Sequence, residues 1–184
     1  ELDALPDEPE CERIDAGAVY EKLTAIEADE LSFVYDRETV LDHVSFSIPK
    51  GSFTVITGES GAGKSTLLKL LLGVYTPQNG AVRLQLQNGA LPISPATRPI
   101  FAYVPQGNLL FSGTLRENLT LASPDASEEA ISQAIYASCM DAFLPELPEG
   151  LNTPLGENSA GLSEGQAQRI AIARAVLRGA PILL

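Results

Sequence analysis

The residues with the clearest chemical potential form a glycine-rich segment, G-x-x-x-x-G-K-S, whose fixed positions are Gly58, Gly63, Lys64 and Ser65. A phosphate chain is bound by closely packed hydrogen-bond donors. Glycine at Gly61 and Gly63 lets the backbone approach the phosphates closely. Lys64 can supply a positive charge, and the hydroxyl of Ser65 can bind Mg²⁺. The spacing therefore predicts a loop that cradles a triphosphate.

The segments on either side of this loop support the prediction. A β-branched run at Phe53–Thr57 predicts a buried strand before the loop. A leucine-rich run at Leu67–Leu72 predicts a helix after it, and Gly73 is a plausible stop. A strand, a glycine loop and a helix in this order are what a phosphate-binding loop requires. The alternative is a glycine turn that carries a lysine by chance.

The remainder of the chain predicts further strands and then helices. Alternating apolar residues predict two strands between residues 30 and 48, joined by a turn at 36–38, and another strand at Ala81–Leu86. A compact strand is expected at Ile100–Val104. Short helices are expected at Leu115–Leu121 and from Ser127 to about Met140. We therefore divide the chain into an acidic linker or arm (1–28), a β subdomain with the loop core (29–106), a helical subdomain (107–162) and a last helix with the start of a strand (163–184).

Charge and composition exclude several classes of protein. The net charge is −12, but residues 1–30 hold eleven acids and two basic residues, a net −9, so the other residues carry only −3. No basic face is evident, and nucleic-acid binding is therefore not expected. Cys11 and Cys139 fit no metal or redox spacing and predict free thiols in a reducing compartment. No signal peptide or bilayer-spanning run is present, so the polypeptide itself is expected to be soluble.

A second candidate segment is Leu162–Gln166. Ser163 and Gln166 have the spacing of a capping box at the start of a helix that ends at Gly179. Gly165 in the first turn lowers helix propensity. An ordinary capped helix explains the segment, and so does a close approach of the backbone to a phosphate.

Three other residues have both a functional and a structural interpretation. Tyr35 ends a predicted strand and could stack on a nucleotide base or simply belong to the core. Gln106 follows a predicted strand and could reach a metal or water, or be a polar loop residue. His43, the one histidine, lies within a predicted strand, and we assign it to a structural or surface role.

Taken in chain order, these motifs resemble the nucleotide-binding domain of ABC transporters. Gly58–Thr66 resembles the Walker A motif, and Gln106 resembles the Q-loop glutamine. Leu162–Gln166 resembles the ABC signature, with Glu164 where the commonest form has glycine. Tyr35 matches the aromatic residue that stacks on adenine. The resemblance covers about residues 28–184, and Walker A together with the signature is highly specific.

Two further segments are similar to the exporter subclass, in which this domain is fused to its membrane segment. They are Gly156-Glu157, which resembles the X-loop, and Phe111–Asn118. The resemblance implies an α/β fold, with a P-loop NTPase core, an N-terminal antiparallel β subdomain and a helical signature subdomain.

The resemblance also implies the ligands and partners. ATP would be held by Lys64 and the loop backbone, Mg²⁺ by Ser65 and Gln106, and the γ-phosphate of an opposing domain in a head-to-tail dimer by the signature. The transmembrane domain of the parent transporter would be another partner, at the cytoplasmic face of the inner membrane. The complete expected set of nucleotide-binding residues is Tyr35, Gly58, Ser60, Gly61, Ala62, Gly63, Lys64, Ser65, Thr66, Gln106, Ser163, Gly165 and Gln166.

The sequence departs from the family pattern at its end. In the family, the strand that begins at Ile182 continues into an Asp that orders Mg²⁺ and a Glu that polarises water, and a switch histidine follows. None of these follows Leu184. We therefore expect a fragment of a transporter ATPase that binds ATP but hydrolyses it slowly, with an exposed sheet edge.

Three other classes of protein share some of these motifs. A chromosome-maintenance or DNA-repair ATPase has the loop and the signature, but also long coiled-coil or zinc-bearing insertions. A non-catalytic regulatory module that binds ATP would explain the missing carboxylates. A small-molecule kinase with a P-loop would leave the signature unexplained.

Overall fold

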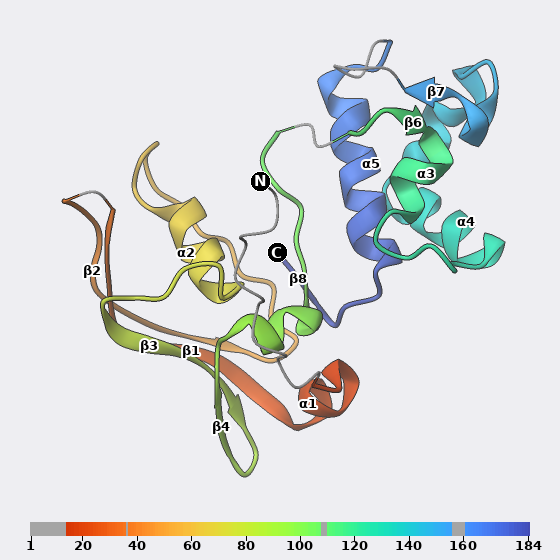
Figure 1. Cartoon of the computed structure of the whole chain (residues 1–184). Helices are drawn as coiled ribbons and strands as arrows, with labels where there is room; N and C mark the ends of the chain where they lie inside the picture. The colour runs from red at the N-terminus through yellow and green to blue at the C-terminus, as the bar shows by residue number, and fades with distance from the viewer. Residues whose placement is uncertain (1–13, 36, 108–109, 156–160) are drawn as a thin grey trace, which may run out of the picture. The chain divides into compact units, whose positions relative to one another are not determined.

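The computed structural model describes residues 14–35, 37–107, 110–155 and 161–184. The chain divides into two compact units, residues 1–101 and residues 102–184 (Figure 1). This division differs from the sequence-based one, because the boundary falls at Phe101 and because the helical segment and the last helix share one unit.

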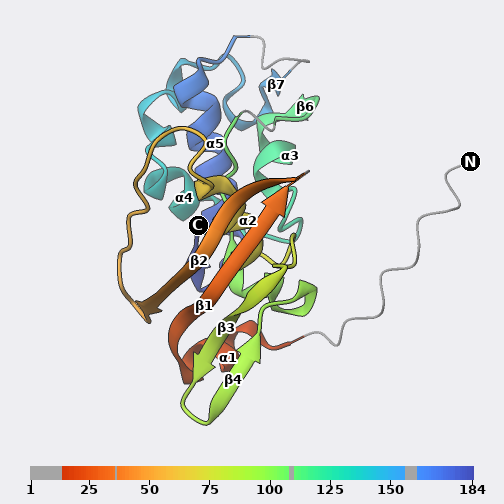
Figure 2. The ribbon, with the colours of Figure 1, turned by 90° about the vertical axis from the view of Figure 1, so that its left-hand side faces the viewer.

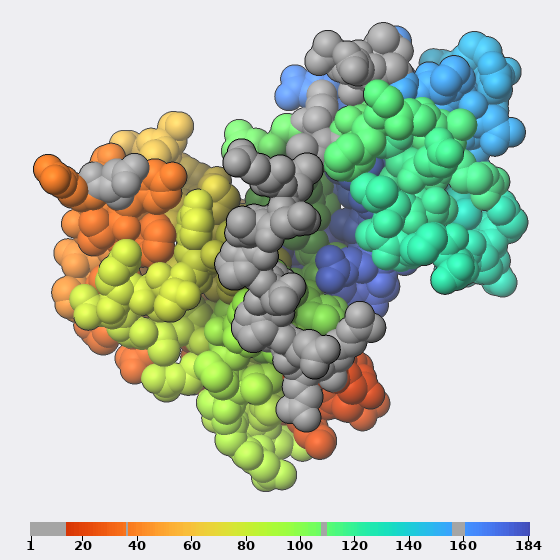
Figure 3. Space-filling model, viewed as in Figure 1, coloured from red at the N-terminus to blue at the C-terminus, as the bar shows by residue number. Residues whose placement is uncertain are grey.

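The first unit is built on a four-stranded antiparallel sheet in the order β2-β1-β3-β4 (Figure 2). The predicted turn between the first two strands is confirmed, since β1 ends at Tyr35 and β2 begins at Glu38. In the space-filling view the hairpin of β3 and β4, in yellow-green, projects from the rest of this unit (Figure 3). The strands are β1 (Leu23–Tyr35), β2 (Glu38–Pro49), β3 (Asn79–Leu86) and β4 (Gly89–Pro92).

Regular structure begins earlier than the sequence indicated. The expected linker extended to residue 28, but helix α1 spans Ala16–Lys22 and β1 begins at Leu23. The carboxylate of Asp15 caps α1 by accepting the N–H of Ala18 at 3.0 Å. Leu23 and Ile26 are buried, yet they do not follow strict alternation, because the register of β1 shifts near its start. Because acidic residues surround these apolar ones, the sequence pattern did not indicate the first part of this strand.

A bulge in β1 brings two backbones unusually close together. The register of β1 with β3 shifts between Asp29 and Ser32, and Glu30 has a positive φ of 48°. Opposite the bulge, Gly80 of β3 has a φ of 73°, and a Cβ at this position would overlap the carbonyl oxygens of Asp29 and Glu30. Glycine is therefore required at position 80 by both conformation and space.

Helix α2 (Lys64–Leu71) has defined ends, as predicted. Gly63 is its N-cap, with a φ of 81°, and Gly73 follows its C-terminus with a φ of 62°. The N–H groups of Gly73 and Val74 return to the carbonyls of Leu70 and Lys69, at 3.0 and 2.9 Å, which is a Schellman ending. Arg98, in the 3₁₀ helix η1 (Pro95–Ile100), donates to the carbonyl of Gly73 at 3.1 Å and so satisfies another group at this end.

The strand predicted at Phe53–Thr57 is not formed in the structure. These residues are irregular, and the side chains of Phe53 and Val55 are 94% and 67% exposed. A strand exists only when a neighbour pairs with its backbone, and a β-branched run does not by itself specify that neighbour. The prediction of a buried strand before the loop was therefore wrong for this structure, although the helix after it was correct.

The second unit is mainly helical. Its longest helix, α5, spans Glu164–Leu177, and the strand β8 (Ile182–Leu183) pairs with β5 (Phe101–Ala102). The strand predicted at Ile100–Val104 is shorter than expected because η1 extends to Ile100. The other elements are β6 (Gly113–Thr114), α3 (Leu115–Thr120), α4 (Glu128–Ala137), η2 (Met140–Ala142), η3 (Leu144–Glu146), η4 (Gly150–Asn152) and β7 (Pro154–Leu155).

One hydrophobic core holds these helices together. Apolar side chains from α3, α4, α5 and the connecting turns meet in a single cluster: Leu115, Leu119, Ala134, Met140, Phe143, Leu155, Ile170 and Ala173. The start of α4 is capped by the hydroxyl of Ser127, as predicted. Among residues 14–35, 37–107, 110–155 and 161–184, no helix combines the length and apolar character needed to cross a bilayer.

The close approach of Gly80 to the bulge in β1 generates a stability prediction. We expect Gly80→Ala to lower the free energy of unfolding by at least about 3 kcal/mol, because the new methyl group meets backbone that cannot rotate away. Gly89→Ala is the matched control: Gly89 also has a positive φ, 126°, but no atom lies within 4 Å of the position that its methyl group would take. Its expected cost is conformational strain alone, about 1–2 kcal/mol. Urea unfolding measures both, and equal midpoints for the two variants would contradict the prediction.

Candidate nucleotide-binding site

The glycine loop presents backbone donors at the start of α2. Gly58, Gly61 and Gly63 all have positive φ values, at 153°, 87° and 81°. Gly63 has no side chain with which to cap α2, so the first N–H groups of this helix have no side-chain cap. A Cβ at Gly63 would meet Val40 and Leu41 of β2 at 2.9–3.0 Å, so the helix start lies directly against the sheet. These features are those of a loop that can donate backbone N–H groups to an anion.

Lys64 adds a full positive charge to this loop. Its ammonium group donates to the carbonyl oxygens of Gly58 and Glu59, at 2.8 and 2.5 Å. The side chain therefore folds back over the loop rather than extending into solvent. The loop is also closed by the N–H of Ala62, which donates to the carbonyl of Glu59 at 3.2 Å. A phosphate group placed here would meet the ammonium group and the helix amides together.

Tyr35 lies at the end of β1 as part of an aromatic cluster. Its ring is 56% exposed and lies 6.4 Å from the ring of Tyr75, tilted by 48°. Tyr75 in turn stacks on the buried Phe33, with ring centroids 5.2 Å apart. The ammonium group of Lys69 lies 5.4 Å from the ring centroid of Tyr75. The exposed ring of Tyr35 thus lies beside the ring of Tyr75 and can offer a surface to a planar base.

The donor set fits a triphosphate, and it fits Mg²⁺ only with the help of other ligands. Among the described residues, no group of three or more His, Cys, Asp or Glu side chains is placed to hold a metal ion. Ser65 contributes a hydroxyl at the exposed start of α2. Mg²⁺ commonly takes few protein ligands and completes its shell with phosphate oxygens and water. This chemistry is therefore compatible with Mg²⁺ bound together with the phosphates.

The predicted signature segment forms a capping box at the start of α5. The hydroxyl of Ser163 accepts the N–H of Gln166 at 3.2 Å, and the side-chain oxygen of Gln166 accepts the N–H of Ser163 at 2.8 Å. No atom lies within 4 Å of the position that a Cβ would take on Gly165. The hydroxyl hydrogen of Ser163 and the NH₂ group of Gln166 are donors that this capping pattern does not consume. The local structure is thus an ordinary capped helix, and it is also chemically compatible with a phosphate.

Gln106 is exposed in a bend that follows β5. Residues 111–118 are attached to α5 through Asn118. The Asn118 side chain accepts the N–H of Phe111 and donates to its carbonyl, both at 2.8 Å. Arg174 of α5 donates to the backbone carbonyl of Asn118 at 2.8 Å and lies over the Phe111 ring. Burial lowers the pKa of Arg174 from its ordinary value. The segment Phe111–Asn118, one of the two that resemble the exporter subclass, thus contains β6 and the start of α3 and is bonded to α5 through Arg174.

The structure gives a clear position to most of the predicted residues. Tyr35 and Gly58–Thr66 belong to the first unit, and Gln106, Ser163, Gly165 and Gln166 belong to the second. Gly156-Glu157 and Cys11, for which the sequence also gave predictions, lie outside the described part of the chain. Cys139 is a free, exposed thiol. His43 is exposed and its ring lies 2.6 Å from the carboxylate of Asp42, in agreement with a surface role.

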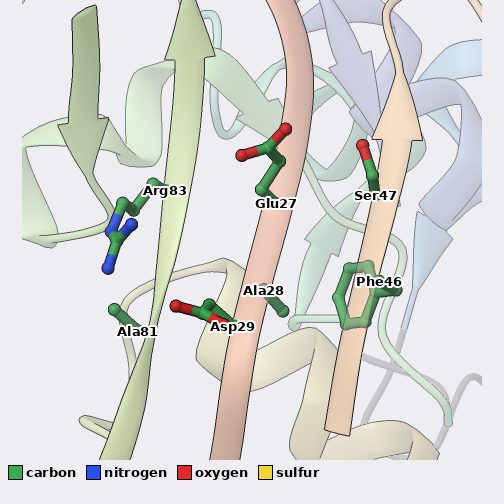
Figure 4. Close-up of a pocket in the computed structure, with 7 residues that line it drawn as sticks. All are labelled: Glu27, Ala28, Asp29, Phe46, Ser47, Ala81 and Arg83. Atoms are coloured by element: carbon green, nitrogen blue, oxygen red, sulfur yellow. The ribbon is translucent and has the colours of Figure 1, made fainter.

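A separate pocket of about 200 Å³ lies on the sheet of the first unit (Figure 4). Its charged side chains are Glu27 and Asp29 of β1 and Arg83 of β3. None of the residues predicted to bind the nucleotide lines it, and we assign it no part in the site.

Tyr75, which contacts Tyr35 and Phe33, was not predicted from the sequence, because its only local signal is an aromatic residue just after a helix.

Comparisons with known proteins identify the family of this chain. The family model described as ABC transporter matches residues 41–184. A probable ABC transporter ATP-binding/permease protein of Haemophilus influenzae is 37% identical over 183 residues, which are 100% of this chain and 33% of that protein. The mycobactin import ATP-binding/permease protein IrtB of Mycobacterium bovis is 41% identical over 161 residues, 86% of this chain and 28% of that protein.

A solved structure is similar over nearly the whole chain. It is a bacterial Atm1-family ABC exporter with ATP bound, with a TM-score of 0.81 and 31% sequence identity, covering 95% of this chain and 30% of that one. The chain thus spans about a third of the length of these relatives. The predicted α/β fold, with an antiparallel β subdomain and a helical subdomain, is confirmed.

Gly165 generates a prediction about the stability of the first turn of α5. Gly165→Ala should raise the free energy of unfolding by about 0.5–1 kcal/mol, because α5 gains helix propensity and the methyl group meets no neighbour. Gly179→Ala is the matched control, since it is equally uncrowded but has a φ of 67°. Thermal unfolding should show the first variant stabilised and the second destabilised. A destabilised Gly165→Ala protein would show that the first turn of α5 is not an ordinary helical turn.

Glu117 generates a prediction about acid stability. Its carboxylate accepts the N–H of Thr114 at 2.6 Å, and this bond lowers the pKa of Glu117 below its ordinary value of 4.5. The resulting stabilisation is present above the unfolded-state pKa and is lost as the pH falls through the lower folded-state value. We expect Glu117→Gln to reduce the loss of stability below about pH 4.5, because the amide still caps α3 but does not titrate. An unchanged pH dependence in urea unfolding would contradict this.

Proposed function

Since this chain belongs to the ABC transporter family and matches its ATP-binding part, we propose that it binds Mg-ATP at Gly58–Thr66 and contributes ATP binding and hydrolysis to a transporter. The observation that carries the proposal is the start of α2. There a helix without a side-chain cap follows a loop of positive-φ glycines, and the ammonium group of Lys64 lies over that loop. Negatively charged phosphate oxygens are the natural partners of such donors.

Each residue of the loop has a distinct role in this proposal. The backbone of Gly61–Thr66 contacts the phosphate chain, and Lys64 exchanges its two carbonyl partners for β- and γ-phosphate oxygens. Ser65 and Gln106 would hold Mg²⁺, which neutralises phosphate charge when it is bound. Tyr35 stacks on the adenine ring, supported by Tyr75.

A second copy or a related domain would complete the site. We propose that Ser163, Gly165 and Gln166 donate to the γ-phosphate of a nucleotide bound to an opposing domain, in a head-to-tail dimer. Support comes from the donors that the capping box leaves available and from the open space at Gly165. Such an arrangement would make dimer formation depend on ATP, because the nucleotide forms part of the interface.

A membrane-spanning permease is the proposed second partner. Two relatives are named ATP-binding/permease proteins, and this chain corresponds to about a third of their length. We infer that the parent protein is a fusion of this kind, with the ATP-binding domain at the cytoplasmic face. One relative is named an import protein and one similar structure is an exporter, so we assign the direction of transport to the permease rather than to this domain.

The proposal predicts that Mg-ATP stabilises the protein against heat. At a hundredfold excess over Kd, binding to the folded state alone should add about 2.7 kcal/mol to the free energy of unfolding. Lys64→Ala should abolish this shift, because the loop loses its charge at the phosphates. The measurement is a thermal unfolding series over ATP concentration, with calorimetric titration for Kd.

Lys22→Ala is the matched control, because Lys22 is an exposed lysine of the same unit, at the end of α1. It should retain the full shift. An equal shift in Lys64→Ala and wild-type protein would place ATP elsewhere and would overturn the proposal.

A further inference from the structure

The end of β1 has a neighbour that is a side chain rather than a strand. The pairing of β1 with β3 reaches Ser32 opposite Asn79, where β3 begins. Just before β3, the N–H of Gln78 donates to the carbonyl of Ser32 at 3.1 Å. The side-chain amide of Gln78 then continues the ladder by one step: its oxygen accepts the N–H of Val34 at 2.9 Å, and its nitrogen donates to the carbonyl of Val34 at 3.1 Å.

We infer that Gln78 is a positioning residue for the base-binding ring of Tyr35, an inference that rests on the proposed ATP site. Val34 directly precedes Tyr35 and pairs with β2 on its other side, opposite Thr39. With Gln78 in place, both edges of β1 are hydrogen-bonded up to the residue before the ring. Without it, the last two residues of β1 would be held from one side only and would fray more readily.

The same short connection also supports the ring directly. Tyr75 and Gln78 lie between α2 and β3, and Tyr75 contacts both Phe33 and Tyr35. One segment therefore fixes the backbone before Tyr35 through Gln78 and packs against its ring through Tyr75. Glutamine suits this task because its amide carries one acceptor and two donors in a plane, as a peptide group of a neighbouring strand would.

The connection also links the two halves of the proposed ligand site. It begins at the Schellman ending of α2, and α2 begins at the phosphate-binding loop. Lys69 of the same helix lies against the Tyr75 ring. The base platform is thus joined to the phosphate loop through one helix and one short turn, and the distance between base and phosphate subsites is set within the first unit.

The test compares ATP with inorganic tripolyphosphate, which carries the phosphate chain without a base. We expect Gln78→Ala to weaken ATP binding by about tenfold, a value within the range for one stacking contact. Tripolyphosphate affinity should change by less than about twofold, because the loop and α2 are untouched. Calorimetric titration of both ligands gives the ratio of the two affinities, which a general loss of stability would not alter selectively.

Two variants sharpen this test. Gln78→Glu keeps the acceptor for the N–H of Val34 but loses the donor to its carbonyl, so its ATP affinity should be intermediate. Gln87→Ala removes an exposed glutamine at the other end of β3 and should bind both ligands like wild type.

The outcomes separate this inference from the proposed function. An unchanged ratio of ATP to tripolyphosphate affinity in Gln78→Ala would overturn the role of Gln78 while leaving the ATP site in place. Equal weakening of both ligands would also overturn it, because the damage would then not be specific to the base. Wild-type protein that bound neither ligand would overturn the proposed function, and this inference with it.

Discussion

The close contact between Gly63 and β2 is the constraint on which the rest of the proposed site depends. A side chain at this position would meet Val40 and Leu41, so the first turn of α2 can lie against the sheet only because Gly63 has no Cβ. That contact fixes where the helix amides and Lys64 point. The partner of β2 in the sheet is β1, which ends in Tyr35. The same pair of strands, β1 and β2, therefore fixes the positions of both the phosphate donors and the aromatic ring.

The two helices that begin at the glycine loop and at the signature segment satisfy their N-termini in opposite ways. Helix α2 has a glycine at its N-cap, and no side chain caps its first amides. Helix α5 satisfies its first turn internally, through Ser163 and Gln166. A ligand at α2 would thus accept hydrogen bonds from amides that no side chain caps. A ligand at α5 can add only to donors that remain after capping, and it is expected to contribute less binding energy.

The sequence was most informative where structure depends on near neighbours. Caps at Ser127 and Ser163, the stop at Gly73 and the turn after Tyr35 were all predictable, because each follows from residues within one or two turns of the chain. The failed strand at Phe53–Thr57 and the unforeseen start of β1 depend instead on which distant backbone pairs with them. The contact between Tyr75 and Phe33 and the clamp from Gln78 to Val34 join residues more than forty positions apart, at separations no local pattern encodes.

The inward-folded position of Lys64 also has a consequence for which anions the proposed site would bind. Its ammonium group already has two carbonyl partners, so an incoming anion binds well only if it can replace both. A phosphate chain brings several charged oxygens and can do so. A halide ion offers a single small contact and would leave one donor poorly satisfied. We therefore expect the loop to discriminate against the abundant monovalent anions of the cell through its own hydrogen bonds, before any base is recognised.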